Sequence, residues 1–515
     1  MGSKYLMKIR DIAEVFDGPH ATPKKIDVGP YFLSISSLVN GQLDLSKSAH
    51  LSEEQFKKWT KRVTPQVGDV LFSYETRLGE AALMPAGVTA CLGRRMGLLR
   101  PDQSKVLPEY LLYAYLSPVF QQEIKKRTIH GATVERISLR ELPDFDIHIP
   151  EIKKQRKVIN TLNAINNKIS LNKKNNHTLE QMAQALFKSW FVDFDPVFDN
   201  LLASVDFKLE NLESSLPEEL KQKAQRRLVA LNSLHNAAEI KASLSALAHE
   251  LQTQLPTKKA TQAAEQVSEK APETTVKANF NANPNILAQH ANTHAHFPSE
   301  FEHNEQLGWI PKGWEYGPFS KIAILKTESI HPKKSPDKLW SQFSLPAFDS
   351  GKTPSLDLGI EIKSGKYKLS NNVVLVSKLN PQTPRVWMPN VVDVESSVCS
   401  TEFMPFEPIL EQHKAFIYAL MSSKFIQTEI ASRVTGTTGS HQRVSPKNIA
   451  VLDVILPSEN CIKLYCEMVG PSFNKINLMS SQSTELTKLR DTLLPKLISG
   501  ELQIPDIATD EEVVD

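Results

Sequence analysis

Hydrophobic and polar positions follow a helical period across residues 151–191, a stretch that contains neither glycine nor proline. One stripe of mostly apolar positions advances in steps of four and three residues, the spacing that keeps one face of a helix against a partner helix. They are Val158, Leu162, Ile165, Ile169, Asn172, Asn176, Leu179, Ala183, Leu186 and Trp190. The two asparagines form a polar step, which lowers stability but fixes register. We predict one helix of roughly 60 Å, at ~1.5 Å per residue, packed on a second helix.

A second copy of this pattern begins about 305 residues later, which makes the chain an internal repeat. YAYLSPVFQQEI at 113–124 matches YALMSSKFIQTEI at 418–430, and NKISL at 167–171 matches NKINL at 474–478. The second stripe contains Tyr465, Val469, Ser472, Ile476, Met479, Ser483, Leu486, Arg490, Leu493 and Leu497. Gly470-Pro471 is expected to interrupt it, and Phe473 is an alternative to Ser472 in the seam. Antiparallel pairing of the two helices satisfies both stripes most simply.

The regions around these helices contain short strand-like runs and helical patches, such as the buried-strand run VGDVLFSYE at 67–75 and the helical spacing at 107–127. We expect an α+β or α/β fold with two similar globular domains, separated by long helices that pair as an antiparallel coiled coil with pseudo-two-fold symmetry. The predicted order is a globular domain at 1–150, a spacer helix at 151–199, a helical insertion at 200–252, a flexible linker at 253–300, a second globular domain at 301–457, a second spacer helix at 458–502 and a disordered tail at 503–515.

Composition excludes few partner classes. The chain has 515 residues with 60 Lys and Arg against 58 Asp and Glu, so any basic surface for nucleic acid must be local. Four scattered cysteines fit neither a disulfide framework nor a zinc site, and we expect no metal. No run of 18 apolar residues and no signal-peptide core occurs, so we expect a soluble, cytoplasmic protein without membrane contact.

Motifs for catalysis on DNA are missing from the sequence. An aminomethyltransferase needs an Asn/Asp-Pro-Pro-aromatic loop, whereas NPNI at 283–286 and NPQT at 380–383 lack the second proline and the aromatic residue. The glycine-rich phosphate loop of a nucleotide-driven motor is also absent. We therefore expect a non-catalytic chain with no cofactor of its own.

Two similar domains at a fixed separation suit a protein that reads two half-sites on duplex DNA. Three stretches resemble HsdS, the specificity subunit of type I restriction-modification enzymes: QALFKSWFVDFDPV at 184–197, FPSEFEHNEQLGWIPKGWE at 297–315 and TELTKLRDTLLPKLISGEL at 484–502. The resemblance covers almost the whole chain except about 200–295, where the linker is longer and more polar than the family pattern.

The resemblance implies two target-recognition domains, each of which reads one half of a bipartite site in double-stranded DNA. It implies that the helices set the gap between the half-sites and dock two methyltransferase (HsdM) subunits, and that translocase-nuclease (HsdR) subunits join the complex. S-adenosylmethionine, ATP and Mg would then belong to the partner subunits. Two alternatives from other classes are a coiled-coil scaffold that reads no DNA and a self-contained restriction enzyme.

Candidate DNA-binding residues lie in polar loops, because Lys and Arg contact phosphates and Arg also pairs with guanine. Two glycine-rich loops at equivalent places in the repeat are favoured, HGATVERIS at 130–138 and GTTGSHQR at 436–443. The candidates of the first domain are Lys24, Lys25, Arg77, Arg94, Arg95, His130, Thr133 and Arg136. Those of the second are Lys333, Lys334, Arg385, Thr437, Thr438, Ser440, His441, Gln442 and Arg443. The alternative for each is a solvated loop residue.

Large apolar residues gather near the C-terminal end of each predicted helix. They are Phe187, Trp190, Phe191 and Phe194 in the first copy and Leu493, Leu494, Leu497 and Ile498 in the second. One interpretation is a docking surface for a partner subunit, and the other is core packing under the linker.

Overall fold

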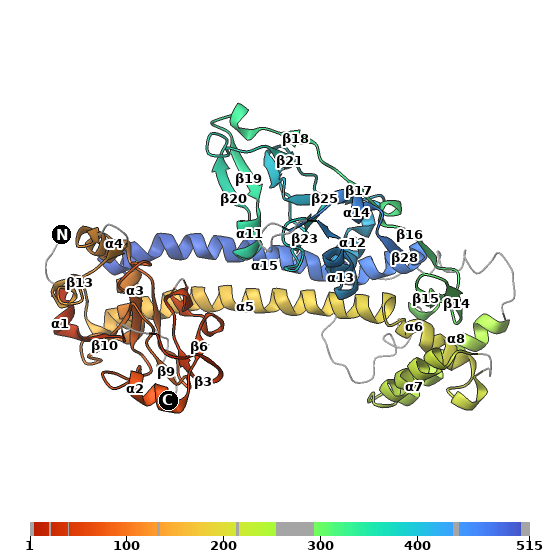
Figure 1. The fold of residues 1–515 in the computed structure, drawn as a ribbon, viewed down its shortest axis with the longest axis horizontal. Coiled ribbons are helices and arrows are strands. Elements are labelled where there is room, and N and C mark those ends of the chain that lie inside the picture. Colours follow the sequence, from red (N-terminus) through yellow and green to blue (C-terminus); the bar gives the residue numbers. More distant parts are fainter. Residues whose placement is uncertain are drawn as a thin grey trace, which may run out of the picture. The chain divides into compact units, whose positions relative to one another are not determined.

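The structure is a computed structural model, which describes residues 5–19, 22–39, 41–130, 134–212, 216–253, 293–435 and 442–505. The chain divides into two compact units (Figure 1). Unit 1 comprises Met1–Lys173 with Ser481–Asp515, and unit 2 comprises Lys174–Ser480. Most of the predicted flexible linker, at 254–292, and most of the predicted tail, at 506–515, lie outside the described residues.

Unit 1 is built on a four-stranded antiparallel sheet, drawn in red and orange in Figure 1. Its order is β2 (Ala13–Asp17), β10 (Met96–Pro101), β7 (Val70–Ser73) and β8 (Ala81–Leu83). All four residues of β7 are buried, which explains the continuous apolar run in the sequence. A smaller sheet has the order β6 (Ala49–His50), β3 (Ile26–Phe32) and β9 (Ala90–Cys91). Finally, β1 (Leu6–Lys8) pairs with β13 (Asp146–His148).

Unit 2 repeats this topology. Its four-stranded sheet has the order β17 (Ala323–Leu325), β25 (Phe403–Pro408), β22 (Val374–Ser377) and β23 (Val386–Trp387). The pair β16 (Glu315–Pro318) and β28 (Asp453–Leu456) corresponds to β1 and β13. The second sheet is larger, with β18 (Ser329–Ile330), β21 (Lys366–Lys368), β24 (Ser397–Ser400), β19 (Leu339–Phe343) and β20 (Ser355–Leu358) in that order. The internal repeat and the mixed fold class are therefore confirmed.

Two consecutive helices follow the sheet in each copy, where the sequence pattern at 107–127 suggested one helical patch. In unit 1 they are α3 (Pro108–Leu116) and α4 (Pro118–Lys126), and in unit 2 they are α12 (Lys414–Ser422) and α13 (Lys424–Ser432). The break falls at a serine whose side chain caps the second helix. Ser117 Oγ accepts a hydrogen bond from Phe120 N, and Ser423 Oγ accepts one from Ile426 N.

The predicted long helices are present as α5 (Ile152–Phe191) and α15 (Glu459–Ser499). The interruption expected at Gly470-Pro471 is wrong, because α15 continues through it. A proline inside a helix removes one backbone hydrogen bond at a cost of about 3 kcal/mol. Val469 and Phe473, on either side, are buried in the core of unit 2 and hold both turns in place. Phe473, not Ser472, faces that core.

Within each unit the two long helices pair antiparallel, as predicted. In unit 1, Asn172 Nδ2 donates hydrogen bonds to Gln482 Oε1 at 2.9 Å and to Ser483 Oγ at 3.3 Å. In unit 2, Asn176 Nδ2 donates to Ser480 Oγ at 3.0 Å. Both members of the predicted polar step are therefore hydrogen-bonded across the seam, and Asn172, only 1% exposed, is buried in it.

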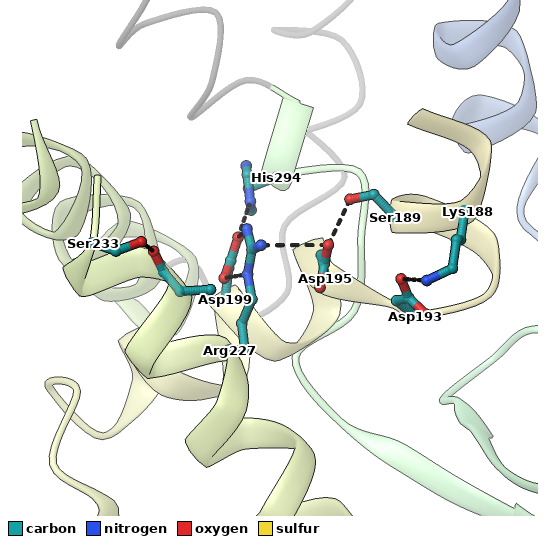
Figure 2. Close-up of polar contacts among 9 residues, drawn as sticks. Lys188, Ser189, Asp193, Asp195, Asp199, Arg227, Ser233 and His294 are labelled. Atoms are coloured by element: carbon teal, nitrogen blue, oxygen red, sulfur yellow. Dashed lines mark hydrogen bonds and ion pairs between the residues drawn. The ribbon is translucent and has the colours of Figure 1, made fainter. Parts of the chain in front are cut away.

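The predicted spacer helix at 151–199 is too long, because α5 ends at Phe191 and a separate helix, α6 (Asp195–Ser204), follows. The region predicted as a helical insertion, 200–252, contains α7 (Glu218–Asn232) and most of α8 (Ala237–Thr253). Figure 2 shows the charged cluster that anchors it. The fully buried Asp199 accepts hydrogen bonds from Arg227 Nε and Nη2, both at 2.7 Å, and lies 3.0 Å from His294 Nε2. Burial alone would raise the pKa of Asp199, but the hydrogen bonds to Arg227 and His294 outweigh it and lower that pKa.

Candidate nucleic-acid interface

A polar loop follows the central buried strand of unit 1. The side chain of Ser73, the last residue of β7, donates a hydrogen bond to Glu75 O at 2.8 Å. Thr76 has a left-handed backbone with φ +73°, which turns the chain sharply after the strand. The loop is therefore fixed to a rigid sheet, a common arrangement for binding residues.

A two-stranded ribbon, β11 (Ile129–His130) and β12 (Glu135–Arg136), packs on that loop. Thr76 N donates to Glu135 O at 3.2 Å, and Ile137 N donates to Tyr74 O at 3.0 Å. The turn before β10 joins them, because Tyr74 N donates to Arg95 O at 3.2 Å. We call the loop 74–77, the turn 94–95 and the ribbon end 135–137 the first junction.

Unit 2 builds the same arrangement after β22. Ser377 Oγ donates to Leu379 O at 3.0 Å, and Asn380 has a left-handed backbone with φ +49°. Its equivalent of the ribbon is β26 (Val434–Thr435) with β27 (Arg443–Val444). Three backbone bonds match those of unit 1: Lys378 N to Glu402 O at 3.0 Å, Asn380 N to Gln442 O at 2.9 Å and Val444 N to Lys378 O at 3.0 Å. We call the loop 378–381, the turn 401–402 and the ribbon end 442–444 the second junction.

Besides Arg77, which belongs to the loop itself, the structure brings three of the predicted DNA-binding residues of unit 1 to the first junction, namely Arg94, Arg95 and Arg136. Arg94 and Arg136 are exposed. Arg95 Nε lies 2.9 Å from Glu75 Oε1, and Arg95 Nη1 donates to Thr76 Oγ1 at 3.1 Å. The three cations therefore lie on two segments, the turn and the ribbon end, whose backbone is bonded to the loop.

The other candidates of unit 1 lie elsewhere or carry other bonds. Arg77 donates to Ile35 O and Glu80 Oε1, both at 3.2 Å, so its guanidinium ties the loop to the domain. His130 is exposed on β11, with Nδ1 at 3.1 Å from Glu135 Oε1. Lys24 and Lys25 are exposed in the segment before β3, and Thr133 lies outside the described residues.

In unit 2 the second junction contains Gln442 and Arg443. Arg443 donates to both carboxylate oxygens of Glu402, at 3.2 and 3.1 Å. Arg385 is similarly forked on Asp349, at 2.7 and 3.0 Å. Lys333 and Lys334 are exposed in the 3-10 turn η7 (Pro332–Lys334). The predicted residues Thr437, Thr438, Ser440 and His441 lie outside the described residues.

Sequence reasoning missed the acidic and polar partners at the junctions. They are Glu75, Thr76, Lys378, Asn380 and Glu402. The internal repeat could have revealed Glu75, Thr76, Lys378 and Asn380, because SYET at 73–76 and SKLN at 377–380 lie at the end of the equivalent buried strand in the two copies. Glu402 carried no such signal, since its partner lies 41 positions further along the chain.

The aromatic residues predicted for partner docking are core residues of unit 2. Phe187, Trp190, Phe191 and Phe194 are 2–6% exposed, and the ring of Phe191 packs on those of Trp314, Phe416 and Tyr465. This burial supports the core-packing alternative. In unit 1, Leu497 and Ile498 are buried in the core, and Leu493 and Leu494 pack against it.

Other apolar side chains on the long helices do face outward. Leu171 and Leu489 are exposed in unit 1, and Met182, Met468 and Leu478 are exposed in unit 2. None of them belongs to the apolar stripes from which the helices were predicted, so periodicity gave no reason to select them.

The chain is similar in sequence to several known proteins. A family model described as the type I restriction modification DNA specificity domain matches residues 4–181. The chain is 24% identical over 423 residues to the type I restriction enzyme HindI specificity subunit of Haemophilus influenzae, covering 79% of this chain and 80% of that protein. It is 22% identical over 522 aligned positions to the MjaIX specificity subunit of Methanocaldococcus jannaschii, covering 97% of this chain and 94% of that protein. Residues 4–181 therefore match the type I restriction modification DNA specificity domain, and the chain as a whole is similar to type I specificity subunits.

Solved structures of specificity subunits are also similar to it. The S subunit from M. genitalium has a TM-score of 0.47 and 12% identity, covering 99% of this chain and 98% of that one. The HsdS subunit from Thermoanaerobacter tengcongensis has a TM-score of 0.30 and 12% identity, covering 96% and 97%. Among the residues that the structure describes, no helix is long and apolar enough to cross a membrane.

Proposed function

We propose that this chain is the DNA-sequence specificity subunit of a type I restriction-modification complex, in which each globular domain reads one half of a bipartite site in double-stranded DNA. The observation that carries the proposal is the pair of junctions. They share one backbone construction and present different side chains, as two readers of different half-sites require.

The chemistry of the junctions suits base readout. Arginine forks pair with guanine O6 and N7 in the major groove, and a carboxylate accepts from cytosine N4. Arg95 and Arg136 lie at the first junction and Arg443 at the second, each on backbone tied to a buried strand. The exposed Lys24, Lys25, Lys333 and Lys334 supply the other kind of contact, with phosphates, which positions a protein without reading sequence.

The long helices would dock two methyltransferase subunits, with translocase-nuclease subunits completing the complex. The exposed apolar residues of α5 and α15 support this docking role better than the buried aromatic residues do, because only an accessible side chain loses water on binding. The chain would itself be non-catalytic, since its sequence lacks the methyltransferase and phosphate-loop motifs. S-adenosylmethionine, ATP and Mg would act in the partner subunits.

The test is methylation mapping of DNA exposed to this chain together with its methyltransferase subunits. Two short sequences at a constant gap are the expected product. Methylation at random, or at one undivided site, would contradict the proposal. Methyl transfer or cleavage by the isolated chain would instead favour a self-contained enzyme, and an assembled complex with no preference among DNA sequences would favour a scaffold.

A further inference from the structure

The two junctions have equivalent positions that can be assigned from backbone bonds alone. Arg95 and Glu402 are equivalent, because the carbonyl of each accepts from the residue that follows the strand-ending serine. Arg136 and Arg443 are equivalent, because each forms an antiparallel bridge with the second residue after that serine, Glu75 in one copy and Leu379 in the other.

The glutamate that pairs with an arginine of the junction occupies a different position in each copy. In the first junction it is Glu75 in the loop, and it holds the arginine of the turn, Arg95. In the second junction it is Glu402 in the turn, and it holds the arginine of the ribbon, Arg443. A carboxylate therefore fixes a different arginine in each domain, on otherwise matching backbones.

Fixing an arginine matters for recognition. A free arginine side chain loses rotamer entropy when it is immobilised, and a guanidinium that pairs with guanine through two donors needs a defined orientation. A carboxylate that holds the guanidinium before DNA arrives removes part of that cost. Both pairs remain accessible, since the side chains of Arg95 and Arg443 are 30% and 47% exposed.

We propose that Glu75 and Glu402 are specificity-determining positioning residues, which orient Arg95 toward a base of one half-site and Arg443 toward a base of the other. The inference rests on the proposed function and adds the residues that make the two half-sites differ. Glu75 and Glu402 act through the arginines with which they pair.

The test uses the full chain in complex with its methyltransferase subunits and the variants Glu75→Gln and Glu402→Gln, with methylation mapping as the readout. Each variant should lose base preference at one or two positions of a single half-site, a different half for each variant. The expected loss of base preference is at most about 30-fold, because the carboxylate offsets only part of the arginine's rotamer entropy and the arginine itself remains. Arg443→Lys keeps the charge but removes the fork, and should affect the same half as Glu402→Gln.

The control is Glu315→Gln, which removes the partner of Lys321 at 3.1 Å on the same unit and should leave both halves unchanged. A variant whose half-site preferences equal those of the wild type overturns the inference, as does one variant that weakens both halves equally. A wild-type complex without a bipartite preference defeats the proposed function itself, so the two failures are distinguishable. Thermal unfolding of each variant separates loss of fold from loss of readout, and Arg443→Lys tests the fork if a glutamine variant unfolds.

Discussion

The buried cluster of Asp199, Arg227 and His294 makes the anchoring of the helical insertion measurable. Replacing Arg227 by Gln removes two 2.7 Å hydrogen bonds from a carboxylate that is fully buried. Removing one partner of a buried ion pair costs about 3–5 kcal/mol, because the other charge stays in a poorly solvating site. Asp199 keeps its contact with His294, and Arg227 is itself 23% exposed. We therefore expect the lower end, about 3 kcal/mol.

The assay is amide hydrogen exchange in the full chain, read over α6 and α7. A loss of ~3 kcal/mol in local opening free energy corresponds to roughly 150-fold faster exchange. The matched control is Lys223→Gln, which removes an exposed ion pair with Glu219 on the same helix and should change exchange by less than about 0.5 kcal/mol. Equal protection of α7 in Arg227→Gln and in the wild type would refute the reasoning. The double variant Arg227→Gln with Asp199→Asn should lose less opening free energy than the sum of the two single variants, because it contains no unpaired buried carboxylate.

Four further outcomes are expected. Asp199 has a lowered pKa in the folded chain, so its contribution to stability should be fully present above the unfolded pKa of about 3.9 and should disappear as pH falls through the folded pKa. Hydrogen exchange of α6, measured as a function of pH in the wild type and in Asp199→Asn, checks this. Burial lowers the pKa of His148, so the unfolded chain takes up a proton first and stability should decrease as pH falls through about 6.5; thermal unfolding of His148→Asn should show a smaller decrease if this is right, and an identical pH profile would contradict it. Arg136→Ala and Arg443→Ala should each cost ~1–3 kcal/mol at one half-site, whereas Lys24→Ala or Lys333→Ala should weaken binding uniformly and reduce the salt slope; competition binding at several salt concentrations separates the two, and unchanged site preference in both arginine variants would remove them from the readout. Deleting one heptad from both α5 and α15 removes ~10 Å of helix and should change the preferred gap between half-sites by roughly three base pairs. Methylation mapping measures this gap, and an unchanged gap in the shortened protein would contradict the prediction.

The sequence predicted the large features because they are periodic and repeated. The stripe from Val158 to Trp190 is visible as steps of three and four, and its shifted copy predicted the antiparallel partner that Asn172 and Asn176 contact. The continuity of α15 at Pro471 was not predictable in this way, since a local rule forbids what the surrounding core stabilises.

The finer side-chain partners were beyond reach for a different reason. The bond between Asp199 and His294 joins residues 95 positions apart, and nothing in their neighbouring sequence links them. The glycine-rich loops pointed to the location of the two ribbons. The pairing of Glu75 with Arg95 and of Glu402 with Arg443 depends on how the loop, the turn and the ribbon end pack together, which the local sequence does not show. For Phe187 and Phe191 the difficulty is different, because a cluster of apolar residues has the same sequence pattern whether it binds a partner or packs in a core.

The frame of each junction depends mainly on main-chain groups, and this has a consequence for how the protein can change over time. A substitution at position 95, 136, 402 or 443 leaves the main-chain bonds of Tyr74 and Lys378 in place. Such a substitution changes the side chain at the surface of the junction but leaves most of the folding free energy unchanged. Under the proposed function, each domain is free to acquire a new target independently of the other, in small steps that do not pass through an unfolded intermediate variant.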